Sequence, residues 1–166
     1  MNRIFLKKDD PLYKYTIQFM EESWGTKGKG IFPGCQPISI ERKHFGILSD
    51  NDYVVCEKTD GTRYMMIAIQ VGNQKTCVFI NRALEMFTVP LNFRMAVFKG
   101  TILEGELYEN TFMIYDCLMN CGEVVGNKNL LDRLQHCEKV VKKSLILTTD
   151  PISLKVKKFH LHDDFK

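Results

Sequence analysis

Long apolar runs are missing from this 166-residue sequence. No run approaches the roughly 18 residues that suggest a membrane-spanning helix. The N-terminus "MNRIFLKKDDPLYK" becomes charged too early for a signal peptide. A strong excess of charge is also missing, since the net charge is +3 at pH 7. Such a balance permits an anionic ligand but does not indicate a nucleic-acid coat protein.

Cysteine is present, but the paired spacing of a zinc ribbon is not. The "CLMNC" pair has the wrong spacing, and no second pair complements it. Nothing indicates secretion, and a domain of this size does not need disulfides. We therefore expect reduced, mostly buried thiols and a reducing compartment, which would be the cytosol, the nucleus or a viral factory. The cysteines are Cys35, Cys56, Cys77, Cys117, Cys121 and Cys137.

The composition is that of an ordinary globular protein, with 45% hydrophobic and 26% charged residues. It predicts one domain with a sizeable core. Residues 1–25 predict an N-terminal helix, because Asp10 suits the cap, Pro11 suits the first turn and apolar residues recur at helical spacing. Residues 26–52 contain so much glycine and proline that we expect a loop.

From residue 53 the pattern becomes that of strands. Residues 53–118 predict two hairpins, the second made of "TILEGELY" and "TFMIYDCLM". Its first strand places Glu104 and Glu106 on one face with Ile102 and Tyr108, and paired carboxylates are unusual there because they repel one another. A helix is expected over 126–143, and later strands with a charged tail over 144–166. Antiparallel hairpins with two helices predict an α+β domain.

Lys58 ends the apolar run "YVVCEK" and enters an Asp-Gly turn at Asp60 and Gly61. On one interpretation this is an ordinary surface hairpin turn. On the other, Lys58 is a nucleophile. An ordinary lysine has a pKa of about 10.4, so attack on phosphorus requires dry surroundings or a nearby positive charge such as Arg63. Gly61 would let the backbone approach a ligand closely.

Four motifs follow one another in a familiar order: "KTDGTR", "FINR", "LEGELY" and "FMIYDCL". Together they resemble the first motifs of the covalent nucleotidyltransferases, which include mRNA capping guanylyltransferases and ATP-dependent DNA and RNA ligases. The upstream segment "FPGCQPISIERKHF" is similar to the leader of cellular-type capping enzymes. The threonine of "KTDG" also favours the capping branch. The resemblance covers residues 30 to 160.

This resemblance implies an antiparallel-sheet, ligase-like (ATP-grasp) nucleotidyltransferase domain. In the family, the motif lysine attacks the α-phosphate of GTP, releases pyrophosphate and forms a lysyl-GMP phosphoramidate. The 5′-diphosphate end of RNA then accepts the GMP. A divalent cation, Mg²⁺ or Mn²⁺, offsets the charge of the pyrophosphate. Lys58 matches the nucleophile.

The other site residues follow from the same motifs. Arg63 is expected to contact the ribose, Arg82 the sugar-phosphate side, and Glu106 the ribose or the metal. Glu104 stands where the family more often has aspartate, and is a second candidate for the metal. Further nucleotide contacts are expected from the Lys58 turn, from an aromatic that stacks on guanine, and from one lysine that donates to guanine O6: Thr59, Asp60, Gly61, Tyr115, and Lys157 or Lys158.

Family members continue with a further acidic strand, a Lys-x-Lys strand and an OB-fold domain, none of which follows Phe159 here. We therefore expect residues 1–166 to be a single partial domain whose incomplete pocket exposes apolar surface. RNA polymerase or the missing OB-fold part would be its partners. Two alternatives stay open: a ligase-type adenylyltransferase, and a non-catalytic nucleotide- or RNA-binding piece. The capping reading predicts a nuclear protein, or a cytoplasmic one if viral.

Overall fold

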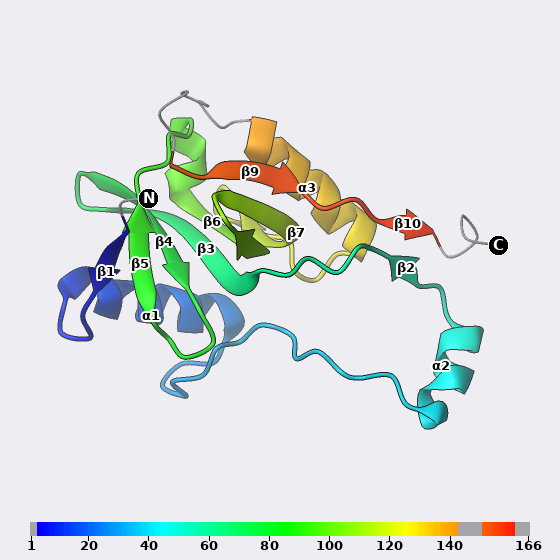
Figure 1. Cartoon of the computed structure of the whole chain (residues 1–166). Helices are drawn as coiled ribbons and strands as arrows, with labels where there is room; N and C mark the ends of the chain where they lie inside the picture. The colour runs from blue at the N-terminus through cyan, green and yellow to red at the C-terminus, as the bar shows by residue number, and fades with distance from the viewer. Residues whose placement is uncertain (1–2, 143–150, 162–166) are drawn as a thin grey trace.

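A computed structural model describes residues 3–142 and 151–161. In these residues one large sheet contains eight strands, in the order β1-β5-β4-β3-β6-β7-β8, with β9 paired to β7. The helices α1 (Pro11–Trp24) and α3 (Leu130–Lys142) lie on opposite faces of this sheet (Figure 1). The predicted α+β class with a large antiparallel sheet is confirmed.

The two predicted hairpins form the centre of the sheet. Strands β3 (Thr62–Val71) and β4 (Gln74–Ile80) are joined by a turn in which Gly72 has a φ of 58°. Strands β6 (Lys99–Tyr108) and β7 (Thr111–Asn120) are joined at Glu109 and Asn110. Because β3 also pairs antiparallel with β6, the two hairpins form one continuous surface.

The remaining strands extend the sheet at its edges. They are β1 (Ile4–Leu6), β5 (Met86–Val89) and β8 (Glu123–Val124), with β9 (Ser153–Val156) beside the first half of β7. β9 was expected as a strand, but it runs parallel to β7. The strand expected over 144–150 and the tail after residue 161 lie outside the described residues.

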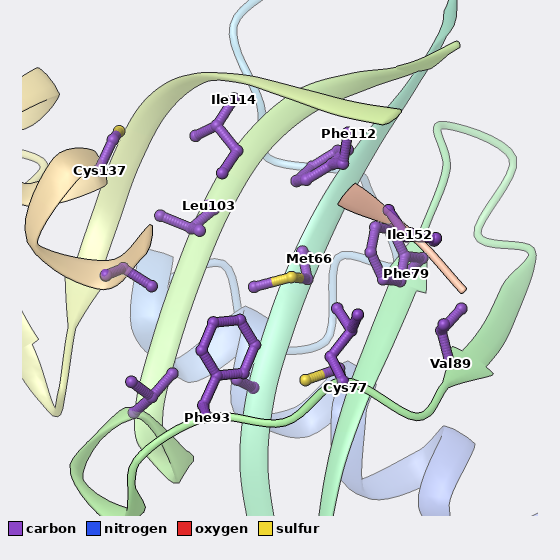
Figure 2. Close-up of a cluster of buried hydrophobic side chains, with 14 of the residues drawn as sticks. Met66, Cys77, Phe79, Val89, Phe93, Leu103, Phe112, Ile114, Cys137 and Ile152 are labelled. Atoms are coloured by element: carbon purple, nitrogen blue, oxygen red, sulfur yellow. The ribbon is translucent and has the colours of Figure 1, made fainter. Parts of the chain in front are cut away.

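Alternation along the strands divides the apolar side chains into two cores. One core lies between the sheet and α3 and is drawn in Figure 2, where Met66 and Leu103 face Cys137 of that helix. The other core lies under α1 and contains Met65 and Ile67 together with Met20 of that helix. Each face of the sheet is therefore covered by a helix.

Helix α1 begins where its local signals place it, whereas α3 begins later than expected. Pro11 is the first residue of α1, and Gly25 ends it with a φ of 62°. The helix expected over 126–143 begins only at Leu130, because Asn129 caps it: the Asn129 side-chain oxygen accepts from the backbone N–H of Asp132 at 2.9 Å. None of the described helices is long and apolar enough to cross a membrane.

The leader expected as a loop over 26–52 is partly helical, and that expectation was wrong for its second half. It contains a 3₁₀ turn η1 (Arg42–His44) and a short helix α2 (Phe45–Asp50). Near it, β2 (Val54–Val55) pairs with β10 (His160–Leu161) in a separate two-stranded sheet. A further 3₁₀ turn, η2 (Met95–Phe98), precedes β6.

Apolar side chains are exposed along this leader. No residue of α2 is buried, and Ile38 is 78% exposed. The other exposed apolar residues of the leader include Ile40, Phe45 and Ile47. Figure 1 shows the leader extending from the end of α1 to α2, away from the large sheet. All six cysteines lie within the described residues and are reduced, as predicted, and three of them are buried.

Candidate functional site

Charged side chains meet where β3, β6 and β7 lie side by side. Arg63 is the register partner of Glu106, and Met65 is the partner of Glu104, so the arginine and both glutamates share one face. Tyr115 joins them from β7. It lies at a register irregularity, because Glu104 pairs with Asp116 while Gly105 already pairs with Ile114. Such bulges redirect side chains next to active sites.

Arg63 and Glu104 form a largely buried ion pair. The Arg63 Nη2 atom donates to Glu104 Oε2 at 2.6 Å, and Glu104 is only 4% exposed. Burial raises the pKa of the Glu104 carboxyl, and the charge of Arg63 opposes this rise. The Tyr115 hydroxyl donates to the same oxygen at 3.4 Å. Burial, and then the charge of Glu104, raise the pKa of Tyr115, so its hydroxyl stays a neutral donor.

Glu106 has a different environment from Glu104. Its Oε2 atom is buried and accepts no hydrogen bond, and the nearest described cation is Lys157, whose Nζ lies 3.7 Å away. The Lys157 side chain is only 8% exposed, and its Nζ lies 5.8 Å from the centre of the Tyr115 ring. Lys158 points to solvent. The structure therefore brings Lys157, and not Lys158, to this cluster.

The backbone fixes Lys157 in place. Its N–H donates to the Ile114 carbonyl at 2.7 Å, which continues the parallel pairing of β9 with β7. The pairing of β9 with β7 thus places Lys157 beside Tyr115, although the two residues are far apart in the sequence. Sequence alternation left Lys157 and Lys158 equivalent, because it does not give the register against β7.

The expected dry surroundings of Lys58 are not present, and this expectation was wrong. The Lys58 side chain is 87% exposed, and its Nζ lies 3.3 Å from Asp60 Oδ1, which is also exposed. Residues 56–61 form no strand, and Val55 pairs with the separate small sheet. The apolar residues before Lys58 therefore do not enclose it. Within the described residues, its known contact is the one with Asp60.

The turn after Lys58 does approach the sheet closely. A Cβ on Gly61 would lie 2.9 Å from the Leu107 carbonyl oxygen, so glycine is required by the neighbouring strand β6. Thr59 is half-buried. Two residues after Gly61, Arg63 enters the ion pair. The lysine turn and the charged cluster thus lie at the same end of the sheet.

Arg82 lies in the turn after β4 and lines an open pocket of about 400 Å³. Its Nη2 donates to the side-chain oxygen of Gln36 in the leader. The leader also contacts Arg63: the Cys35 carbonyl accepts from Arg63 Nη1, and the Phe32 ring lies 5.4 Å from the guanidinium carbon. These leader contacts were not predicted, although the "FPGCQP" motif that supplies them was recognised.

One further ion pair supports the site from behind. Arg133 of α3 donates to both carboxylate oxygens of Asp116, at 2.7 and 3.0 Å. The hydrogen bond to Asp116 raises the pKa of Arg133, and burial opposes this rise. Asp116 follows Tyr115 directly, so this bidentate pair fixes the strand at its bulge.

The two glutamates differ in their suitability for a metal ion. The described residues contain no group of three acidic, histidine or cysteine side chains that could hold one. Glu104 Oε2 accepts from Arg63 and Tyr115, whereas Glu106 Oε2 accepts no hydrogen bond and forms a longer ion pair, at 3.7 Å, with Lys157. Glu106 alone therefore fits a site in which substrate phosphates supply most of the ligands, as is usual for Mg²⁺.

An antiparallel sheet with arginines, paired acids, a tyrosine and lysines gathered at one end agrees with the nucleotidyltransferase-type α+β domain that the motifs resemble. Comparison with known proteins gives the family: the mRNA capping enzyme catalytic domain matches residues 7–164. The chain belongs to this family.

Individual relatives agree with this assignment. The mRNA-capping enzyme of Danio rerio is 33% identical over 75% of this chain and 22% of its own length. That of Mus musculus is 31% identical over 81% of this chain and 26% of its own length. The mRNA-capping enzyme subunit alpha of Neurospora crassa is 36% identical over 52% of this chain and 27% of its own length. The chain thus matches about a quarter of each of these relatives.

Proposed function

We propose that this chain carries the guanylyltransferase chemistry of mRNA capping. The neutral amine of Lys58 attacks the α-phosphorus of GTP, a P–N bond forms, and the bond to the bridging oxygen breaks to release pyrophosphate. The terminal phosphate oxygen of an RNA 5′-diphosphate then attacks the same phosphorus, and Lys58 leaves. The observation that carries this proposal is the family match over residues 7–164, together with the charged cluster beside the Lys58 turn.

On this proposal, each side chain of the cluster has a task around the nucleotide. Arg63 keeps a buried Nε–H without a hydrogen-bond partner, which is available for a ribose oxygen. Tyr115 offers a ring face to guanine. Lys157 lies beside that ring and supplies a donor for guanine O6, where adenine would present a donor amine. This arrangement favours GTP over ATP, which is the distinction between the capping and ligase branches.

A divalent cation fits at Glu106. When bound, it would neutralise charge on the pyrophosphate leaving group. The buried free oxygen of Glu106 would hold it, or would accept from a ribose hydroxyl in its absence. Glu104 serves the site indirectly, because its carboxylate is committed to Arg63. The nucleus is the compartment that this function implies, in line with the eukaryotic relatives.

The exposure of Lys58 favours one alternative function. A lysine that is 87% exposed lacks the dry walls that keep an amine neutral, so the chain would bind nucleotide without forming the lysyl-GMP bond. On the catalytic proposal, bound GTP and a partner segment enclose the amine. RNA polymerase or an OB-fold domain are the partners we propose for that surface.

One labelling experiment separates these functions. The chain is incubated with α-labelled GTP and Mg²⁺ or Mn²⁺, and protein-bound label is measured after denaturation. The catalytic proposal predicts acid-labile, alkali-stable label that is absent from Lys58→Ala and much weaker with ATP. Equal labelling by ATP would favour a ligase. Binding of GTP in equilibrium dialysis without any label would support the binding function instead.

A further inference from the structure

The leader segment Phe32–Gln36 crosses the site and contacts two of its arginines. Its first residue places a ring beside the Arg63 guanidinium, its Cys35 carbonyl accepts from Arg63, and its Gln36 side chain accepts from Arg82. Phe32 is buried, which anchors the segment to the core under α1. One short stretch therefore connects β3, where Arg63 begins the ion pair, to the turn after β4.

The approach of this segment to the sheet is close enough to exclude a side chain at Gly34. A Cβ there would lie 2.5 Å from Glu104 Oε1 and 2.6 Å from Arg63 Nη2. Neither atom is the free end of a mobile side chain, because the two residues are paired with one another. Glycine is thus required by contact with the buried ion pair.

The partners of the two arginines differ in charge. Arg63 has a carboxylate partner in Glu104, whereas the hydrogen bond that the structure gives Arg82 goes to a neutral amide. A neutral acceptor fixes the direction of a guanidinium without cancelling its charge. The Arg82 charge therefore stays available at the pocket that Gln36 and Arg82 line together.

We propose that Phe32–Gln36 is a positioning strap, in which Gln36 directs Arg82, still fully charged, toward the phosphates of the bound nucleotide. This inference rests on the proposed function for the identity of the anion. It assigns Gln36 a role that requires an amide: glutamate would bind Arg82 more strongly but would cancel its charge. Alanine would preserve the charge and release the side chain.

The decisive variants are Gln36→Glu and Gln36→Ala in the full chain, with Gln74→Glu as a control. Gln74 is exposed on β4, and its replacement by glutamate changes the net charge by the same amount as Gln36→Glu. Transfer of GMP to an RNA 5′-diphosphate, in which each Lys58 turns over repeatedly, is measured against GTP concentration. Gln36→Glu should raise KM about two- to fivefold and leave kcat unchanged. A change of this factor corresponds to the free energy of an exposed ion pair. The increase should shrink at high salt, and Gln74→Glu should match the wild type.

A second measurement does not need catalysis. Side-chain ¹⁵N relaxation of Arg82 is compared between the wild type and Gln36→Ala, with Arg94 as an exposed reference. The strap predicts a rigid Arg82 that becomes as mobile as Arg94 in the variant. Equal KM values for Gln36→Glu and Gln74→Glu, or an Arg82 already mobile in the wild type, would overturn the strap. Absence of label in the wild type would count against the proposed function alone, because relaxation still decides the strap.

Discussion

Replacing Arg63 by methionine would leave the Glu104 carboxylate buried without its cationic partner. The pair is close, at 2.6 Å, and the glutamate side chain is the more buried of the two. After the replacement, only the Tyr115 hydroxyl, at 3.4 Å, would still donate to the same oxygen. A buried charge that loses its partner destabilises the folded state, because its desolvation is no longer offset.

The expected loss is about 3 kcal/mol of unfolding free energy. Breaking a buried pair by removing one partner typically costs about 3–5 kcal/mol. We take the lower end because Arg63 is partly solvated and Tyr115 still donates. For a domain of this length, about 2–4 °C is lost per kcal/mol, so the melting temperature should fall by about 6–12 °C.

The pH dependence of this loss follows from the raised pKa of Glu104. Burial raises that pKa already in the wild type, and removing Arg63 takes away the main opposing influence. A carboxyl whose pKa is higher in the folded state favours the folded state when protonated. The Arg63→Met variant should therefore regain stability as the pH falls toward the unfolded pKa of about 4.3.

Urea unfolding followed by circular dichroism tests this at pH 7.5 and pH 5. Arg94→Met, at an exposed position, is the control for the change of side chain. Glu104→Gln and the double variant complete a double-mutant cycle. The unfolding free energy of the double variant should be at least about 2 kcal/mol higher than the sum of the two single losses predicts. Additive losses, or a deficit of Arg63→Met that is unchanged at pH 5, would refute the reasoning.

Three further predictions concern other parts of the molecule. Gly34→Ala should lower the urea midpoint and weaken labelling, because its Cβ would lie 2.5 Å from Glu104 Oε1, whereas Gly46→Ala, with no atom within 4 Å, should not. Burial and a nearby lysine lower the pKa of His136. The wild type should therefore lose stability as the pH falls through about 6.5, and His136→Gln should lose less in parallel urea titrations. Cys35, which is exposed, should react with a thiol reagent in the native state, while the buried thiols react only after unfolding.

Local pattern was sufficient to predict the centre of the fold. Alternation and turn residues give the hairpins, and Pro11 and Gly25 mark the ends of α1. The parallel pairing of β9 could not be predicted, because the letters "SLKV" indicate a strand but not its neighbour. Likewise, the helix α2 has only 6 residues, which is too short for a helical period to be recognised in its apolar residues.

The site was predictable in composition but not in geometry. The motifs named Arg63, Glu104, Glu106 and Tyr115, and the structure gathers them at one end of the sheet. The different environments of Glu104 and Glu106 depend on burial and on the bulge at Tyr115. Neither can be predicted from the alternation of residues along a strand. The open environment of Lys58 could not be predicted either, because the sequence shows the apolar run before it but not what that run packs against.

The parallel pairing of β9 has a consequence for the order in which a ribosome makes this protein. Synthesis delivers the arginines, the glutamates and the tyrosine first, and Lys157 arrives only after α3 has been translated. Until then a nascent chain holds the Glu106 carboxylate without the amine that later stands 3.7 Å away. The charged cluster is thus completed only after α3 and β9 have been translated, so shorter nascent forms would lack the Lys157 amine.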